Sequence, residues 1–96
     1  MNKYESVIII NPNITDDEIK VIIENLKKII ADNNGFITKV EELGKKKLAY
    51  EIKKCQEGCY VVIYFEAEPN VISELERVYR IKDEIIKYMT IRTDEE

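Results

Sequence analysis

The sequence predicts an α+β protein of the split βαβ type, in which two helices cover one face of a four-stranded antiparallel sheet. Two observations lead to this prediction. Segments typical of strands and segments with helical spacing of apolar residues follow one another in the order βαββαβ. The chain of 96 residues, 45% hydrophobic and 35% charged, has enough apolar content for one core and too few residues for a second domain.

The first expected element is a strand from Tyr4 to Ile10, which is rich in β-branched and aromatic residues. It ends at Asn11-Pro12-Asn13, a typical turn sequence. Because apolar residues occupy both faces of this segment, we expect it to be a central strand of the sheet.

A helix is expected next, and its start carries several signals. Thr15 has the place of the N-cap, and Glu18 three residues later can return the bond as in a capping box. Ile14 and Ile19 have the spacing of a hydrophobic staple. Asn34-Gly35 supplies the stop. The expected buried face consists of Ile19, Ile22, Ile23, Leu26, Ile29 and Ile30.

A long extended segment follows from Phe36 to Lys53, with Gly44 as a bulge or bend in the strand. We expect Gln56-Glu57-Gly58 to form the turn of a hairpin. The returning segment from Cys59 to Ala67 is almost continuously apolar or aromatic, which indicates a second central strand.

Pro69-Asn70 is expected to open the second helix, and Ile85 to Arg92 is expected to form the last strand. The inner face of this helix is expected to consist of Val71, Ile72, Leu75, Val78 and Tyr79. The sequence therefore predicts a single ferredoxin-like domain over residues 1–92, with one sheet face uncovered. We expect Thr93 to Glu96 to be a short acidic tail.

Several classes of protein are excluded or disfavoured. The chain has no histidine, the commonest general base and a common metal ligand, so we expect neither an enzyme nor a metal site or cofactor. Cys55 and Cys59 are expected to be reduced structural thiols, although their proximity would not forbid a disulfide. No apolar run approaches the roughly 20 residues that cross a bilayer, and no secretion signal is recognisable, so we expect no membrane contact and a cytoplasmic location.

Positive charge is concentrated in one segment. Residues 39–54 contain six lysines and three glutamates, a net charge of +3, whereas the rest of the chain sums to −7. One interpretation is an ordinary solvated β-ribbon, whose lysines discourage aggregation at a sheet edge. The other is a phosphate-binding strand, in which Lys45, Lys46 and Lys47 meet an RNA backbone. In that case Tyr50 offers a ring for stacking or a hydroxyl for hydrogen bonding.

An acidic protein with a single lysine ribbon should bind nucleic acid only weakly by itself. A second, basic protein could supply the missing charge and use the acidic remainder of this chain as its docking surface. Lysines contact phosphate as point charges, so they would position RNA without reading its sequence.

Tyr60 and Tyr64 are expected to share one face of the third strand, with Tyr4 and Tyr88 on neighbouring strands. An RNA-recognition motif uses the same topology with aromatic residues on its central strands. Its basic-glycine-aromatic run is missing here, because the corresponding segment is EGCYVVIY, with Glu57 where positive charge is needed. Core packing or contact with a protein partner is therefore favoured for these tyrosines.

Four segments of the chain together carry a family resemblance: YESVIIINPN, VEELGKKKLAYEIKK, EGCYVVIYFEA and ELERVYRIKDEIIKYM. In this order they resemble the family of the sixth protein of the small (30S) subunit of the bacterial ribosome. This resemblance implies a structural, RNA-binding protein of the small subunit that takes part in translation. It also implies that the protein binds the central domain of 16S ribosomal RNA as a heterodimer with a small basic ribosomal protein, the eighteenth of the same subunit.

The resemblance implies positions for the RNA contacts as well. The resemblance carries over the basic-strand positions and Lys3. The positive charge around the second helix and the last strand adds Arg80, Lys82, Lys87 and Arg92 as further candidates. The expected RNA-binding residues are Lys45, Lys46, Lys47, Tyr50, Lys53, Lys54, Lys3, Arg80, Lys82, Lys87 and Arg92. The alternative is a small-molecule-binding regulatory domain, since the ferredoxin-like fold also hosts metabolite-binding modules. No Gly-rich phosphate loop supports that alternative, and no small-molecule substrate is expected.

Overall fold

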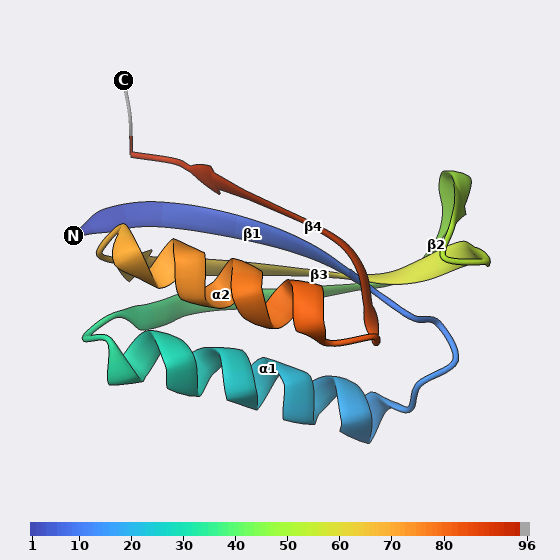
Figure 1. Cartoon of the computed structure of the whole chain (residues 1–96), viewed down its shortest axis with the longest axis horizontal. Coiled ribbons are helices and arrows are strands. Elements are labelled where there is room, and N and C mark those ends of the chain that lie inside the picture. The colour runs from blue at the N-terminus through green and yellow to red at the C-terminus, as the bar shows by residue number, and fades with distance from the viewer. Residues whose placement is uncertain (95–96) are drawn as a thin grey trace.

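The structure is a computed structural model that describes residues 1–94. Its elements are β1 (Asn2–Ile10), α1 (Asp16–Asp32), β2 (Phe36–Ile52), β3 (Cys55–Ala67), α2 (Asn70–Ile81) and β4 (Ile85–Arg92). The strands form one antiparallel sheet in the order β2-β3-β1-β4, and both helices lie on one side of it (Figure 1). The predicted fold class is confirmed, and β1 and β3 are the central strands. Glu95 and Glu96 of the expected tail lie outside the described residues.

The start of α1 forms half of the expected capping box. The Thr15 hydroxyl accepts a hydrogen bond from the Glu18 backbone N–H at 3.2 Å, as an N-cap does. The Glu18 carboxylate accepts from the same hydroxyl at 3.2 Å instead of from the Thr15 backbone. Ile14 packs against the core that contains Ile19, as the hydrophobic staple requires.

The end of α1 is a Schellman turn. Asn34 has a φ of 66°, the left-handed conformation that this turn needs. The N–H groups of Asn34 and Gly35 donate to the carbonyl oxygens of Ala31 and Ile30 at 3.0 and 2.8 Å. The stop lies where the sequence predicts it, but Asn34 adopts the unusual φ, whereas a side chain on Gly35 would collide with the Glu66 carbonyl oxygen.

The main core lies between the sheet and the two helices. β1, β3 and α1 contribute alternate or helically spaced apolar residues, as their patterns predict. Tyr4 stacks on Phe65 with ring centroids 5.5 Å apart. The fully buried hydrophobic residues include Ile8, Ile10, Leu26, Ile30, Ile63, Phe65, Val71, Leu75, Tyr79 and Ile85.

One polar side chain is buried in this core. Ser6 on β1 is fully buried, and its hydroxyl is 2.9 Å from the Tyr79 hydroxyl of α2 and 2.9 Å from the Thr90 hydroxyl of β4. Each of the three hydroxyl groups, of Ser6, Tyr79 and Thr90, therefore has a hydrogen-bond partner. The burial of Ser6 thus leaves no side-chain polar atom of the described residues unsatisfied.

The β2–β3 hairpin turns at a different place from the one predicted. The turn is Lys53-Lys54, with φ values of 47° and 65°, and not Gln56-Glu57-Gly58. A two-residue hairpin turn of type I′ requires positive φ at both central residues, and Asn-Gly is the usual sequence signal for it. Two consecutive lysines do not resemble that signal, so the sequence did not predict a turn here. As a result β3 begins at Cys55, and Gly58 lies inside the strand.

The bulge expected at Gly44 is confirmed. The pairing of β2 with β3 shifts between Glu42 and Gly44, and Gly44 has a φ of 80°. Beyond this point the hairpin leaves the plane of the sheet and curls away from the helices, at the far end of the sheet from the start of β1 and the end of β4 (Figure 1).

Candidate functional site

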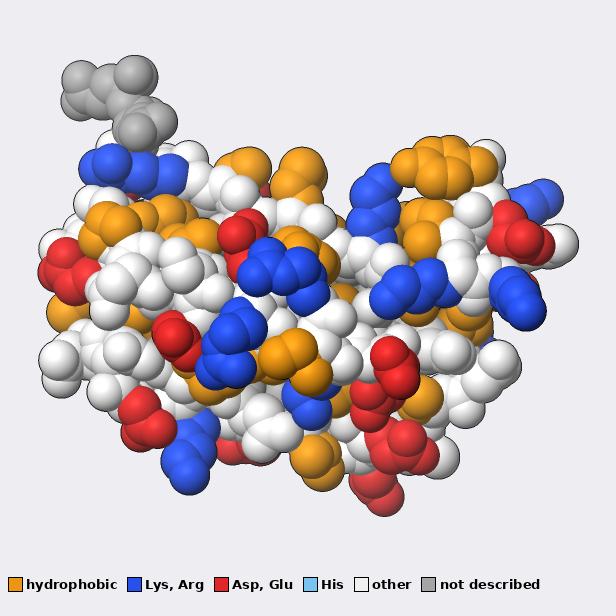
Figure 2. Space-filling model, viewed as in Figure 1, with side chains coloured by type: hydrophobic (Ala, Val, Ile, Leu, Met, Phe, Trp, Pro, Cys, Tyr) orange, Lys and Arg blue, Asp and Glu red, His pale blue; other side chains and the backbone are white. Residues whose placement is uncertain are grey.

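The predicted basic segment forms the outer part of this hairpin. Residues 45–57 are named here the lysine hairpin, and five lysines stand on it: Lys45, Lys46, Lys47, Lys53 and Lys54. All five are exposed, and none forms an ion pair with a carboxylate of residues 1–94. Their ammonium groups are therefore available to an external anion. Figure 2 shows Lys and Arg side chains around the hairpin and Asp and Glu side chains gathered near the start of α1.

Tyr50 is the aromatic residue of the site. Its side chain is 62% exposed, and its hydroxyl accepts a hydrogen bond from Lys87 Nζ of β4 at 3.0 Å. The same ammonium lies 5.3 Å from the centroid of the Tyr50 ring, within cation–π distance. This hydrogen bond lowers the pKa of Tyr50 and raises the pKa of Lys87. The structure thus brings the predicted residue Lys87 to the lysine hairpin.

A second lysine lies over an aromatic ring. Lys46 Nζ is 6.0 Å from the centroid of Tyr60, which lies on the sheet face that the helices leave open. Lys53 Nζ donates to the Ile85 carbonyl oxygen at 3.3 Å. Sequence reasoning missed both contacts. The first depends on the pairing register of β2 with β3, and the second joins residues that are 32 positions apart in the chain.

Two of the predicted RNA contacts lie at the opposite end of the sheet. Lys3 and Arg92 follow the β1–β4 pairing toward the chain termini, whereas the lysine hairpin lies beyond the other end of β1. Arg92 Nε donates to Asp94 Oδ1 at 2.7 Å, and this contact lowers the pKa of Asp94. Arg80 and Lys82 close α2 at the end of the molecule where the hairpin stands, but on the helix side (Figure 1).

The four tyrosines that could offer rings for base stacking divide between the two sheet faces. Tyr4 and Tyr88 face the helices, where Tyr88 lies 5.1 Å from the ring of Tyr79. Tyr60 and Tyr64 are on the open face. The Tyr64 hydroxyl donates to Glu41 Oε1 at 2.7 Å, and this bond, with burial and Glu5, raises the pKa of Tyr64 to about 12.

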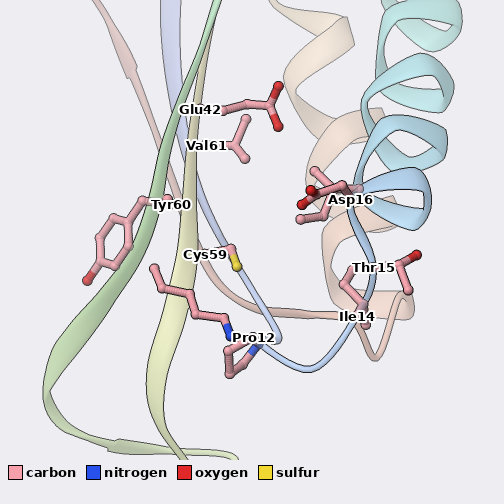
Figure 3. A pocket seen from close by; sticks show the side chains of 11 residues that line it. Pro12, Ile14, Thr15, Asp16, Glu42, Cys59, Tyr60 and Val61 are labelled. Carbon is pink, nitrogen blue, oxygen red and sulfur yellow. The ribbon is translucent and has the colours of Figure 1, made fainter.

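A hollow of about 390 Å³ lies between the start of α1 and strands β2 and β3. Figure 3 shows Glu42 and Cys59 projecting from the sheet toward α1, where Asp16 lies. Burial raises the pKa of the Cys59 thiol, so the thiol is a poor nucleophile at neutral pH. Among residues 1–94, no group of three His, Cys, Asp or Glu side chains could hold a metal ion.

Both cysteines are free thiols. Cys55 and Cys59 are four residues apart on β3, which separates their Cα atoms by roughly 13 Å. A disulfide needs a separation of about 6 Å, so the bridge that sequence proximity left open cannot form within this fold. In the part of the chain described, no helix is long and apolar enough to cross a membrane.

Comparisons with known proteins point to one family. The sequence profile of the family described as Ribosomal protein S6 matches residues 3–92. The chain is 45% identical to the small ribosomal subunit protein bS6 of Caldanaerobacter subterraneus subsp. tengcongensis, over 99% of this chain and 100% of that protein. It is 46% identical to the protein of the same name from Thermoanaerobacter pseudethanolicus, with the same coverage.

A solved structure agrees with this family. The crystal structure of 30S ribosomal protein S6 from Thermotoga maritima matches with a TM-score of 0.88 and 46% sequence identity. The match covers 96% of this chain and 87% of that one.

Proposed function

The chain belongs to the ribosomal protein S6 family, and from this membership we propose that its lysine hairpin binds the phosphates of 16S ribosomal RNA. As a family member it is a structural, non-enzymatic component of the small subunit of the cytoplasmic ribosome. The binding to RNA is the step that we infer.

The observation that carries this proposal is the set of unpaired lysines on a projecting hairpin. Within residues 1–94 none of the five hairpin lysines forms an ion pair with a carboxylate, so a phosphate would not have to displace one. Each phosphate that such a lysine contacts releases a counterion, which favours binding. Because lysine contacts phosphate as a point charge, the hairpin would recognise the RNA backbone and not its base sequence.

The direct contacts that we propose are on the hairpin. They are Lys45, Lys46, Lys47, Tyr50, Lys53 and Lys54. Arg80 and Lys82 are further candidates at the same end of the molecule, and Lys87 lies there bonded to Tyr50. Lys3 and Arg92 would require a second RNA contact at the opposite end of the sheet.

We further propose that the small basic ribosomal protein, the eighteenth of the subunit, binds together with this chain in the central domain of 16S ribosomal RNA. Outside residues 39–54 the chain has a net charge of −7, so it would attract a basic protein and repel RNA. The combined complex would then present enough positive charge for tight binding.

Charge reversal tests the proposal. In the variant Lys45→Glu/Lys46→Glu/Lys47→Glu, we expect the affinity for a central-domain RNA fragment, measured with the basic protein at several salt concentrations, to fall more than about tenfold. The slope of log affinity against log salt concentration should also decrease in magnitude by about two or three, since about one unit is lost with each phosphate contact. The matched control Lys20→Glu/Lys27→Glu/Lys28→Glu places the same charge change on exposed positions of α1.

An equal loss of affinity in both triple variants would contradict the hairpin site, because only total charge would then matter. Circular dichroism should show both variants folded, since exposed charges contribute little to stability. Tight binding of the wild type without the basic protein would contradict the partner-dependent part of the proposal.

The alternative of a small-molecule-binding regulatory domain receives no support from the relatives described above, which are named as ribosomal proteins. We also propose that residues 1–92 act as a single domain, since the four strands form one sheet and both helices pack on it.

A further inference from the structure

The position of the hairpin lysines depends on the angle at which the hairpin leaves the sheet. The pairing of β2 with β3 is interrupted twice in this region, at Gly44 and again between Lys47 and Ile52. A two-stranded ribbon without further support is only marginally stable in water. Something outside the ribbon must therefore hold its curl.

An apolar cluster separate from the main core provides one part of that support. Leu48 is the only buried side chain of the lysine hairpin and is 7% exposed. It packs with Ile9 of β1 and Ile86 of β4, which are 7% and 6% exposed, with Ile52, Cys55 and Tyr60 around them. Leu48 thus joins the hairpin to the open face of the sheet.

Two lysine contacts provide the other part. Lys87 Nζ donates to the Tyr50 hydroxyl at 3.0 Å, and Lys53 Nζ donates to the Ile85 carbonyl oxygen at 3.3 Å. With Ile86, three consecutive residues of β4 therefore contact the hairpin, through a carbonyl oxygen, an apolar side chain and an ammonium group. This contact set between residues 85–87 and the hairpin is named here the clasp.

The clasp separates Lys87 of β4 from Lys45 and Lys47 of the hairpin, whereas Lys53 takes part in the clasp through one of its three N–H groups. The ammonium groups of Lys45 and Lys47 make no hydrogen bond or ion pair within residues 1–94, whereas Lys87 is bonded to Tyr50. A group that is already bonded within the protein is better suited to fixing geometry than to meeting phosphate. A hairpin that is ordered before binding avoids the entropy loss of ordering it on RNA.

We propose that Leu48 and Lys87 are positioning residues, which hold the lysine hairpin at one angle through the clasp so that its lysines meet RNA already ordered. This inference rests on the proposed function, because it assigns these residues a role in the same RNA contact.

Two variants test the clasp. In Leu48→Ala and Lys87→Met, we expect amide hydrogen exchange of residues 46–57 in the free protein to accelerate by about tenfold, with the central strands unchanged. RNA affinity in the presence of the basic protein should fall several-fold. The salt dependence should keep its wild-type slope, since no phosphate contact is removed. Lys87→Arg should restore both the exchange rates and the affinity.

Matched controls separate the clasp from general effects. Val71→Ala truncates a buried residue of α2 in the main core, and Lys20→Met removes an exposed charge from α1. Both should leave hairpin exchange unchanged relative to the rest of the sheet and should leave RNA affinity near the wild-type value.

Each other outcome overturns a different statement. Unchanged hairpin exchange in both variants would overturn the clasp. A salt slope reduced by about one in Lys87→Met, with unchanged exchange, would make Lys87 a phosphate contact and overturn its positioning role. Absence of RNA binding by the wild type would overturn the proposed function, and the exchange data would still show whether the clasp holds the hairpin.

Discussion

Gly58 shows how a single residue can be required by space and not by backbone conformation. It is buried inside β3 opposite Lys46, and a Cβ atom there would collide with Ile9 Cγ2 and meet Ile86 Cδ1 at 3.5 Å. We expect Gly58→Ala to lower the free energy of unfolding by about 1–3 kcal/mol through overpacking. Urea denaturation would measure this as a lower midpoint.

Gly44→Ala is the control for this prediction. No atom lies within 4 Å of the position that its Cβ would take, so its cost comes from the φ of 80° alone. We expect that cost to be about 1 kcal/mol. A larger loss of stability at Gly44 than at Gly58 would contradict the steric explanation.

Tyr79 gives the protein a dependence on alkaline pH. Burial raises its pKa from 10.0 to about 12, with the Ser6 hydrogen bond opposing the rise. The folded state thus holds the proton more tightly than the unfolded state, so this contribution is complete below pH 10 and is lost as the pH rises toward 12. We expect unfolding free energy to fall over that range by about 2–3 kcal/mol through this residue. Urea denaturation at pH 9 to 12 should show a shallower decline in Tyr79→Phe, and an identical decline would contradict the assignment.

At the scale of elements, the β2–β3 turn has two lysines at positions whose backbone conformation favours glycine or asparagine. Lys53 and Lys54 adopt positive φ, which is strained for a lysine and favourable for glycine. We expect Lys54→Gly to raise the free energy of unfolding by about 0.5–1 kcal/mol and to weaken RNA binding. Thermal unfolding and the RNA titration described above would measure both effects. A gain in stability with unchanged RNA affinity would remove Lys54 from the proposed contacts.

The same turn explains which elements the sequence could predict. α1 has a capping residue, a staple and a stop, and β4 has clear strand character, so both were predicted within about one residue. The β2–β3 turn was predicted to start three residues too late in the chain, because Gly58 resembles a turn residue, whereas its lack of a side chain makes room for Ile9. Local patterns report backbone preference, but they do not report which side chain arrives from another strand.

At the scale of the whole molecule, the segregation of charge could be predicted and the assembly of the site could not. The excess of lysine between residues 39 and 54 is visible in the sequence. That Lys87 joins Tyr50, and that Lys3 and Arg92 lie at the other end of the sheet, depends on strand order and on the curl of the hairpin. These are properties of the complete sheet.

The buried Ser6 helps to fix the register in which the edge strand β4 pairs with β1. A slip of β4 by one residue would turn its apolar side chains toward solvent, so the hydrophobic pattern already opposes that error. A slip by two keeps the pattern, yet it would separate Thr90 from Ser6 and place Tyr88 or Arg92 opposite this small residue, beneath α2. Ser6 therefore favours the observed alignment of β4 over both two-residue shifts, which the burial of apolar surface alone does not distinguish from it.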